Sequence, residues 1–287
     1  MSSDSAELDN AGMVQVWDGQ VGRDWVAEQD RYARMNAGFT EMLLAAAAVQ
    51  PGERVLEVGC GFGAVAYRLG ELAGPAGEVV GVDVSGPMLE VAAERAADLA
   101  QVSFRHDDAQ EGDLGEASYA LAVSQFGVMF FADPAKAIGN IVSALRPGGR
   151  LAFTCWQDMS LQPRIVVPAA AALTHIPVPE MDQDFWGLKA FSLADPQAIE
   201  DLLGHAGLAD IRIEPATSPE YLGSDVADTV EFMRRTEFGQ LLFADVDNQT
   251  AERGWDAVAT ALTDHQTSDG VYLDGAAWLV TARREPA

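Results

Sequence analysis

Basic residues are scarce in this chain. Only 18 lysines and arginines stand against 44 aspartates and glutamates among its 287 residues, which gives a formal net charge of −26. A surface this negative repels the phosphates of nucleic acids and anionic lipids. The densest basic runs are the pairs Arg234–Arg235 and Arg283–Arg284, which do not form a basic patch. We therefore expect no nucleic-acid or membrane partner, and we attribute the charge to solubility.

Cysteines and long apolar runs are also few. Cys60 and Cys155 are too few for a disulfide framework and are compatible with a reducing cytosol. The longest apolar run, residues 42–49, is too short to span a bilayer. The acidic first ten residues lack the basic and apolar regions of a secretory signal. These features predict a cytoplasmic protein, and the 48% of hydrophobic residues predicts a globular core.

The middle of the chain alternates short apolar segments with helical ones. Five strands are expected there, each followed by a turn or a helix of roughly ten residues, at 54–58, 78–82, 102–106, 119–124 and 150–156. Parallel strands joined in this way need right-handed crossover helices on the faces of the sheet. The rhythm therefore predicts a doubly wound α/β domain with a mainly parallel sheet.

The rhythm changes after Trp156. A helix is expected over 164–175, followed by a segment rich in proline, acid and aromatics, and then a helix ending at His205. Two late strands, at 208–213 and 276–283, flank helices near 226–243 and 249–265. We expect these strands to complete the sheet and the helices to lie over the ligand crevice.

Three alternate glycines, Gly59, Gly61 and Gly63, follow the first strand and lead into a helix. Such a turn lets backbone approach a ligand closely and offers it the unpaired N–H groups of a helix start. Asp83 ends the second strand about 20 residues later, where a carboxylate can accept both hydroxyls of a ribose. A surface turn residue is the alternative for Asp83, and a nicotinamide dehydrogenase fits these features as well as other nucleotide enzymes do.

Two further segments separate these alternatives. Asp108-Ala109 ends the third strand, and Arg146-Pro147-Gly148-Gly149-Arg150 precedes the fifth. With V-L-E-V-G-C-G-F-G and V-G-V-D at this spacing, the chain resembles the class I S-adenosylmethionine-dependent methyltransferases, in particular their bacterial small-molecule branch related to quinone-biosynthesis enzymes. The resemblance is strong over residues 39–160. It implies a Rossmann-like seven-stranded sheet with an antiparallel last strand and a helical cap insertion.

The resemblance also implies a division of the chain. Residues 1–38 would form an N-terminal helical lid, 39–160 the S-adenosylmethionine-binding core and 161–194 the cap insertion. Residues 195–287 would complete the sheet, with a helical insertion at 224–265. The lid carries Trp17, Trp25 and Tyr32, for which ordinary helix packing is an equal alternative.

The cofactor residues follow from the same resemblance. Glu57 would lie near the methionine amino group, Asp83 would hold the ribose hydroxyls, and Asp108 would accept from the adenine amino group. The other cofactor contacts would come from the glycine turn, from apolar residues beside the adenine and from the end of the fourth strand: Gly59, Cys60, Gly61, Gly63, Val84, Met88, Ala109, Ser124 and Gln125. For Cys60 we prefer a small filler of the turn to a nucleophile.

Methyl transfer from a sulfonium needs alignment, exclusion of water and, for a protonated nucleophile, removal of one proton. It needs no metal, and none is expected. His175 is the candidate base, although an exposed histidine at a helix end is the alternative. Candidate acceptor contacts, each also compatible with core packing, are Phe126, Met129, Trp156, Phe185 and Trp186.

The expected function is methyl transfer to a small apolar, aromatic or polyketide-like acceptor at oxygen, carbon or nitrogen. The partner is thus a small molecule, and a homodimer is compatible with the sequence. A protein that keeps the cofactor but catalyses another reaction, such as a cyclisation, is the alternative. We disfavour a nicotinamide oxidoreductase, because such an enzyme has no role for Asp108-Ala109.

Overall fold

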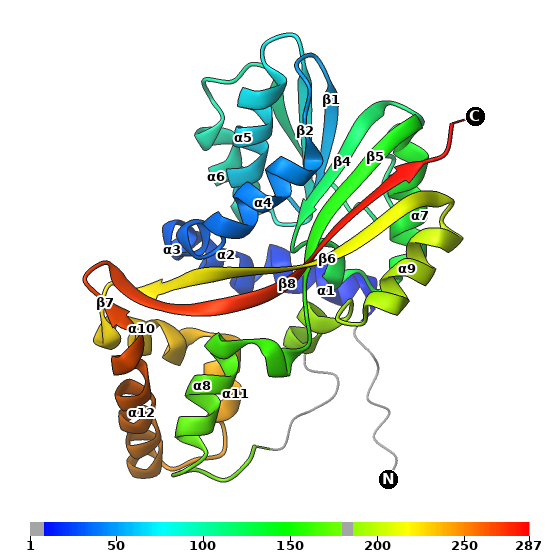
Figure 1. Cartoon of the computed structure of the whole chain (residues 1–287). Coiled ribbons are helices and arrows are strands. Elements are labelled where there is room, and N and C mark those ends of the chain that lie inside the picture. The colour runs from blue at the N-terminus through cyan, green and yellow to red at the C-terminus, as the bar shows by residue number, and fades with distance from the viewer. Residues whose placement is uncertain (1–8, 180–185, 287) are drawn as a thin grey trace.

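The computed structural model describes residues 9–179 and 186–286, and its centre is one sheet (Figure 1). The strand order is β3-β2-β1-β4-β5-β8-β6, and the two-residue β7 (Gln266–Thr267) pairs with β8. Strands β1 to β5 are parallel, whereas β8 runs antiparallel to β5 and β6. The seven long strands are β1 (Arg54–Val58), β2 (Glu78–Asp83), β3 (Val102–His106), β4 (Tyr119–Gln125), β5 (Leu145–Trp156), β6 (Leu208–Gly223) and β8 (Gly270–Arg284). The predicted doubly wound sheet with an antiparallel last strand is confirmed.

Helices cover both faces of this sheet. Val55 and Leu56, neighbours on β1, have no solvent exposure and belong to separate apolar clusters, because successive side chains of a strand point to opposite faces. The Val55 face packs against α4 (Ala37–Ala47) and α5 (Ala64–Ala73). The Leu56 face packs against α7 (Pro134–Ala144) and α9 (Pro196–His205). Two-sided burial explains why the parallel strands are apolar throughout.

Strands β6 and β8 are much longer than expected. They pair from Leu208 opposite Arg284 to Gly223 opposite Val271, whereas β5 pairs only with the second half of β8, from Ala277 to Arg283. The remaining half projects from the sheet as a two-stranded arm (Figure 1). The prediction of two short strands was wrong because Pro215 and Pro219 interrupt the strand pattern of β6. Both prolines are tolerated because β6 is an edge strand.

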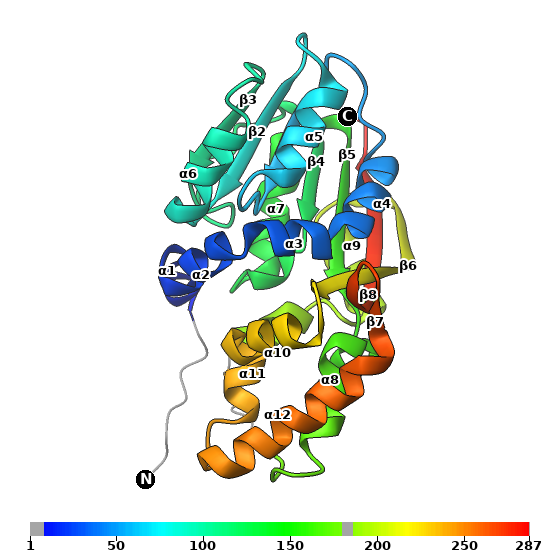
Figure 2. The same ribbon diagram turned by 90° about the vertical axis from the view of Figure 1, so that its left-hand side faces the viewer.

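The arm carries a lobe of helices, the cap. It is built by α8 (Pro163–Ala172), α10 (Val226–Arg235), α11 (Glu237–Leu242) and α12 (Asn248–Leu262), with α8 and α12 side by side (Figures 1 and 2). The apolar centre of the cap includes Phe232, Trp255, Val258 and Leu262. Residues 163–172 and 226–262, which fall within the two predicted insertions, therefore share one lobe.

The helix expected near 226–243 is in fact two helices, α10 and α11. The break falls at Thr236, whose hydroxyl accepts a hydrogen bond of 3.2 Å from the N–H of Gly239 and so caps α11. This break places Glu237 at the start of a separate short helix. The chain also forms a 3₁₀ helix over Trp186–Phe191.

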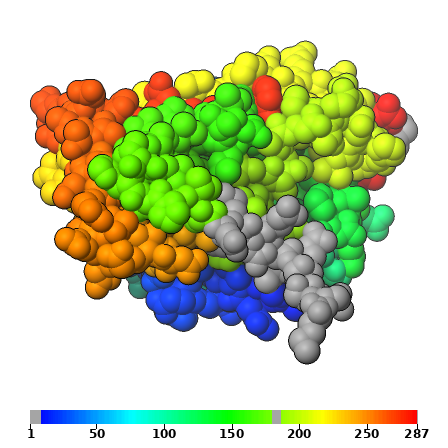
Figure 3. All heavy atoms as spheres, turned by 90° about the horizontal axis from the view of Figure 1, so that it is seen from below, coloured from blue at the N-terminus to red at the C-terminus, as the bar shows by residue number. Residues whose placement is uncertain are grey.

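The N-terminal segment forms α1 (Asn10–Asp18), α2 (Gln20–Ala27) and α3 (Gln29–Met35), which cross between the core and the cap (Figure 2). In Figure 3 these helices (blue) border the orange helices of the cap. Asp18 accepts a 2.8 Å hydrogen bond from the N–H of Gly86 at the start of α6 (Gly86–Arg95). Ser85 is the N-cap residue of α6, but its hydroxyl makes no capping bond.

No helix within residues 9–179 and 186–286 has the length and apolar character needed to cross a membrane.

Candidate active site

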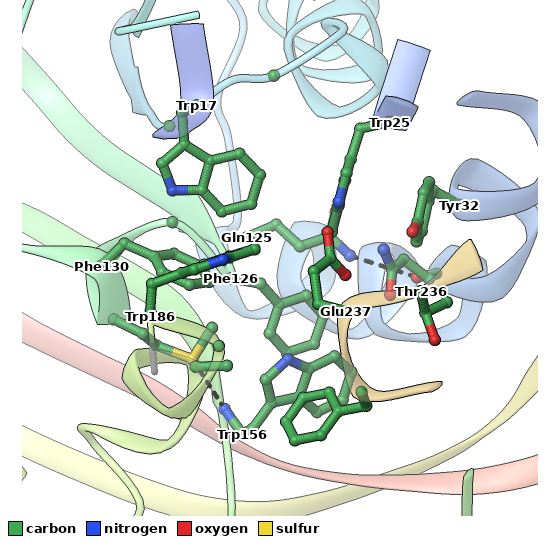
Figure 4. Close-up of a pocket in the computed structure, with 18 of the residues that line it drawn as sticks. Trp17, Trp25, Tyr32, Gln125, Phe126, Phe130, Trp156, Trp186, Thr236 and Glu237 are labelled. Atoms are coloured by element: carbon green, nitrogen blue, oxygen red, sulfur yellow. Dashed lines mark hydrogen bonds between the residues drawn. The ribbon is translucent and has the colours of Figure 1, made fainter. Parts of the chain in front are cut away.

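A cavity of about 500 Å³ lies where the carboxyl ends of the parallel strands meet the lid and the cap (Figure 4). The core contributes the glycine turn after β1, the ends of β2 and β3, and the residues that end β4 and β5. The lid contributes Trp17, Trp25 and Tyr32, and the cap contributes Arg164 and Glu237. Carboxyl ends of parallel strands are the expected position of a ligand in this kind of sheet.

The glycine turn brings two backbone segments into close contact. Gly59, Gly61 and Gly63 all have positive φ, at 66°, 51° and 73°. A Cβ at Gly59 would lie 3.0 Å from the Cα of Gly127, a residue of the loop after β4 that the sequence analysis did not single out. Gly59 and Gly61 line the cavity, whereas Gly63 precedes α5 and packs on Ala92. The turn therefore offers backbone to the cavity without side chains in between.

Asp83 lies beside this turn. Its Oδ2 accepts a 2.7 Å hydrogen bond from the N–H of Gly61, and its Oδ1 accepts one of 2.9 Å from the N–H of Ser85. Burial raises the pKa of Asp83, while these backbone donors act in the opposite direction. Each carboxylate oxygen can accept more than one hydrogen bond, so Asp83 can still bind two ligand hydroxyls.

Glu57 provides the test of whether a cationic cofactor group fits the site. The side chain lines the cavity and is 2% exposed, yet its Oε2 has no hydrogen-bond partner. Burial, with the charge of Asp83, raises the pKa of Glu57 well above its usual range, and a hydrogen bond from the Ala66 N–H acts the other way. A buried carboxylate oxygen without a donor is costly. The ammonium of a methionine moiety would supply the missing partner.

Asp108, together with Glu57 and Asp83, forms the polar wall of the cavity. Its Oδ1 accepts a 2.8 Å hydrogen bond from the N–H of Gln110, and its Oδ2 accepts one of 2.5 Å from the amide of Asn10 in the lid. Further residues expected beside an adenine also line the cavity, namely Val84, Met88 and Ala109. Cys60 lines it too, and burial raises the pKa of its thiol well above the usual range, which supports the filler interpretation over a nucleophile.

Aromatic side chains form the rest of the wall. The rings of Phe126 and Trp156 stack with centroids 3.8 Å apart, and Trp17 packs edge-on against Phe130 at 4.9 Å and Trp186 at 5.6 Å. Phe126 has a positive φ of 57°, which a bulky residue rarely adopts and which is common near functional sites. Core, lid and cap thus build one aromatic chamber (Figure 4).

Gln125 lies between the polar and aromatic walls. Its Oε1 accepts a 3.0 Å hydrogen bond from the hydroxyl of Thr40, and its amide donates one of 3.3 Å to the carbonyl of Asn36. Met129 also lines the cavity, as expected.

Besides Gly63, the expected site residues His175 and Ser124 do not line the cavity. His175 is exposed in the turn after α8 and does not line the cavity, because α8 ends at Ala172 and the chain then turns to solvent. Its interpretation as the base is therefore withdrawn. Ser124 is buried and lies beneath Gly127 rather than in the cavity. The expected acceptor contact at Phe185 falls outside the described residues.

Arg164 and Glu237 are two charged cavity residues that the sequence did not predict. Neither belongs to a motif, and only the tertiary placement of the cap brings them to the core. The Thr236-Glu237 pair, a typical helix start, was the one available signal. Among the described residues, no group of three or more histidine, cysteine, aspartate or glutamate side chains is arranged to hold a metal.

Comparison with known proteins agrees with this geometry. Residues 55–149 match the family model described as a methyltransferase domain. Over these residues the chain is thus similar to a methyltransferase domain. This similarity supports S-adenosylmethionine as the cofactor.

Nocamycin O-methyltransferase of Saccharothrix syringae is 30% identical over 178 residues, which cover 57% of this chain and 61% of that protein. The other first relatives match over 38% to 48% of their own length, so the chain spans about half the length of its curated relatives.

Two solved structures share the fold. Phosphoethanolamine N-methyltransferase 2 of Haemonchus contortus, solved with S-adenosyl-L-methionine, superposes with a TM-score of 0.59 at 19% identity, covering 96% of this chain and 60% of that one. The [4+2]-cyclase SpnF superposes with a TM-score of 0.54 at 20% identity, covering 93% of this chain and 97% of that one.

Proposed function

We propose that this chain transfers the methyl group of S-adenosylmethionine to a small apolar or aromatic metabolite in the closed chamber. The observation that carries the proposal is the division of one cavity into two walls. One wall presents Glu57, Asp83 and Asp108, and the other is built from aromatic rings. A charged, hydroxyl-rich cofactor suits the first wall, and a flat acceptor suits the second.

On the polar wall, each acid has a distinct task. Glu57 would pair with the ammonium of the methionine moiety, and Asp83 would accept from the two ribose hydroxyls. Asp108 would accept from the adenine amino group, with Val84 and Met88 against the ring. Gly59 and Gly61 would let the cofactor lie against the backbone of the turn.

When bound, the cofactor supplies an electrophilic methyl group attached to a neutral leaving group. The protein has to hold the acceptor in line with that methyl group and to exclude water. Phe126 and Trp156 offer a stacked wall for a planar acceptor, while the lid and the cap cover the chamber. Gln125, fixed by Thr40 and Asn36, lies at the boundary between the two walls.

The relatives support an oxygen acceptor in a natural product. Nocamycin O-methyltransferase carries oxygen methylation in its name. The family model matches residues 55–149 only, so it leaves out the lid and the cap, which form part of the acceptor wall. A cytoplasmic location and a homodimer stay predictions.

A cofactor-binding protein that catalyses a cyclisation is the second candidate. It is supported by the aromatic chamber, which can fold a flexible substrate, and by the shared fold with a protein named as a [4+2]-cyclase. The two candidates differ in whether the methyl group moves.

Calorimetry and a labelling assay test the proposal in turn. S-adenosylmethionine should bind in the micromolar range, and a nicotinamide dinucleotide should not. Incubation with methyl-labelled cofactor and a panel of hydroxylated aromatic compounds should then label an acceptor. Binding of the nicotinamide alone would refute the proposal, while conversion of a polyene substrate without label transfer would establish the cyclase.

A further inference from the structure

The chamber contains one acid that the cofactor does not need. Glu237, the first residue of α11, lines the cavity from the cap side. Its carboxylate points into the interior of the chamber, among Trp25, Trp156 and Trp186 (Figure 4). Glu57, Asp83, Asp107 and Asp108 lie on the cofactor wall. Within the described residues, Glu237 is thus the one carboxylate that the lid and the cap contribute.

The other titratable residues around the chamber are unsuited to accept a proton at neutral pH. No histidine or lysine of the described chain lines the cavity. Burial raises the pKa of Tyr32, so its phenol stays protonated, and Arg164 is a permanent cation. Burial likewise keeps the thiol of Cys60 protonated. Glu237 remains.

We infer that Glu237 is the general base of this enzyme and that the acceptor is an aromatic compound whose hydroxyl donates its proton to this carboxylate. The inference rests on the proposed methyl transfer. The hydroxyl oxygen would form a bond to the methyl carbon as the carbon–sulfur bond breaks. The electron pair of that bond stays on sulfur, giving neutral S-adenosylhomocysteine, and the proton moves to Glu237 and later to solvent.

The surroundings of Glu237 support this role. Burial among aromatic rings raises the pKa of Glu237, and the negative charge of Asp24 on α2 adds to the effect. A carboxylate with a raised pKa is a stronger base, better matched to a phenol than an exposed one. The titratable groups facing it are Asp24 from α2 and Tyr32 from α3. The backbone N–H of Glu237 itself donates to the carboxylate and acts against the rise in its pKa. Each carboxylate oxygen can accept more than one hydrogen bond, so the group can still accept one from an acceptor hydroxyl.

A coloured phenol tests this role without knowledge of the natural acceptor. The probe is 2-hydroxyanthraquinone, a planar compound whose visible spectrum distinguishes the phenol from the phenolate. The full-length protein is first saturated with S-adenosylhomocysteine, which confines the probe to the acceptor wall. A titration of the bound dye then gives the pKa of its hydroxyl. If the Glu237 carboxylate accepts a hydrogen bond from the dye, it raises the pKa of the dye's hydroxyl, because the phenolate would lie beside a second negative charge.

We expect Glu237→Gln to lower the pKa of the bound hydroxyl by about one unit or more relative to the wild-type complex. Glu237→Asp should retain most of the wild-type value. Glu231→Gln, which changes an exposed acid on α10, is the matched control and should leave it unchanged. Equal pKa values in the wild type and in Glu237→Gln would overturn the assignment, and so would failure of the dye to bind the loaded protein.

Cofactor affinity separates this inference from the proposed function. Glu237→Gln should bind S-adenosylhomocysteine as the wild type does, which also shows that the variant is folded. If the wild type binds no S-adenosylhomocysteine, the proposed function fails. If the wild type binds S-adenosylhomocysteine and the dye, but the pKa of the bound hydroxyl is the same in Glu237→Gln, only the base assignment fails. With methyl-labelled cofactor, the rate for Glu237→Gln should fall at least about 100-fold at neutral pH. That rate should recover as the pH approaches the pKa of the dye, since a preformed phenolate needs no base.

Discussion

The Nε of Arg164 lies 3.1 Å from the Oε2 of Glu220, a carboxylate with no solvent exposure. Arg164 belongs to α8 and lines the cavity with its guanidinium 4.8 Å from the ring centroid of Trp156. Glu220 belongs to the arm, where a Cβ at Gly275 on β8 would lie 2.5 Å from the same Oε2. The glycine makes room for the buried acid. The long arm therefore fixes one wall of the chamber.

The pH dependence of stability should report this buried acid. Burial raises the pKa of Glu220 to about 7, although Arg164 acts in the opposite direction. An unfolded glutamate titrates near about 4.3, so the folded state binds the extra proton between these values. The stability contributed by this proton is complete below about pH 4 and is lost as the pH rises through about 7. It amounts to about 4 kcal/mol.

Glu220→Gln cannot titrate, so its free energy of unfolding should fall less steeply between pH 5 and pH 8 than that of the wild type. Urea unfolding at four pH values measures the difference between the two slopes. Glu214→Gln, on the exposed side of the same strand, is the control and should keep the wild-type slope. Parallel curves for the wild type and Glu220→Gln would show that Glu220 does not take up this proton.

Asp83 should contribute to cofactor affinity through its charge. Asp83→Asn keeps the size of the side chain but weakens the hydrogen bonds to the ribose hydroxyls, so we expect a loss of about 1–3 kcal/mol, roughly 5- to 150-fold in Kd. Calorimetry with S-adenosylhomocysteine measures it. Glu78→Gln lies at the opposite end of β2, where Glu78 pairs with Arg54, and should bind as the wild type does. Unchanged affinity in Asp83→Asn would remove Asp83 from the site.

Gly59 and Gly52 provide a matched pair for testing the turn. Both have positive φ, at 66° and 84°, but only Gly59 is crowded, whereas a Cβ at Gly52 meets nothing within 4 Å. Gly52→Ala should cost about 1 kcal/mol of stability from backbone strain alone. Gly59→Ala should cost more, because its Cβ also presses on Gly127, and it should weaken cofactor binding at least about tenfold. Thermal unfolding and calorimetry give both values. Equal losses in the two variants would mean that the close approach to Gly127 is unimportant.

The core and the cofactor wall were predictable because local signals specify them. Strand length, alternate glycines and the acids Asp83 and Asp108 lie within a few residues of the backbone features that position them. The cavity lining therefore includes nearly every expected cofactor residue. Ser124 and Gly63 are the exceptions. Whether a residue at or just after the end of a strand faces the cavity depends on the loop that follows.

The acceptor wall was less predictable because it is assembled from distant segments. Arg164 and Glu237 are more than 70 residues apart in the sequence, and the arm brings their helices to the same chamber. The arm was itself missed, because Pro215 and Pro219 weaken the strand pattern. His175 looked suitable by residue type, but its position one turn beyond α8 faces solvent.

The lid is bonded to the cap by Arg31. Its Nη2 lies 2.7 Å from the Oδ1 of Asp228 on α10, and its side chain is only 13% exposed. Hydrogen bonding to Arg31 lowers the pKa of Asp228, so the pair is charged at neutral pH. Hydrogen bonds between charged, partly buried groups contribute about 1.5–3 kcal/mol. This contact should therefore hold α3 against the cap and keep the chamber closed.

Arg31→Gln should open the lid more often. Amide hydrogen exchange in residues 10–36 should become about tenfold faster or more, while exchange in the strands of the core stays unchanged. Arg23→Gln is the matched control, because Arg23 lies on the same lid but bonds only to the nearby Gln20 among the described residues. Exchange measured by mass spectrometry on peptides of the lid gives the comparison. If Arg31→Gln and Arg23→Gln exchange alike, the ion pair with Asp228 does not restrain the lid, and packing of Tyr32 on Phe232 of the cap would have to account for its closure.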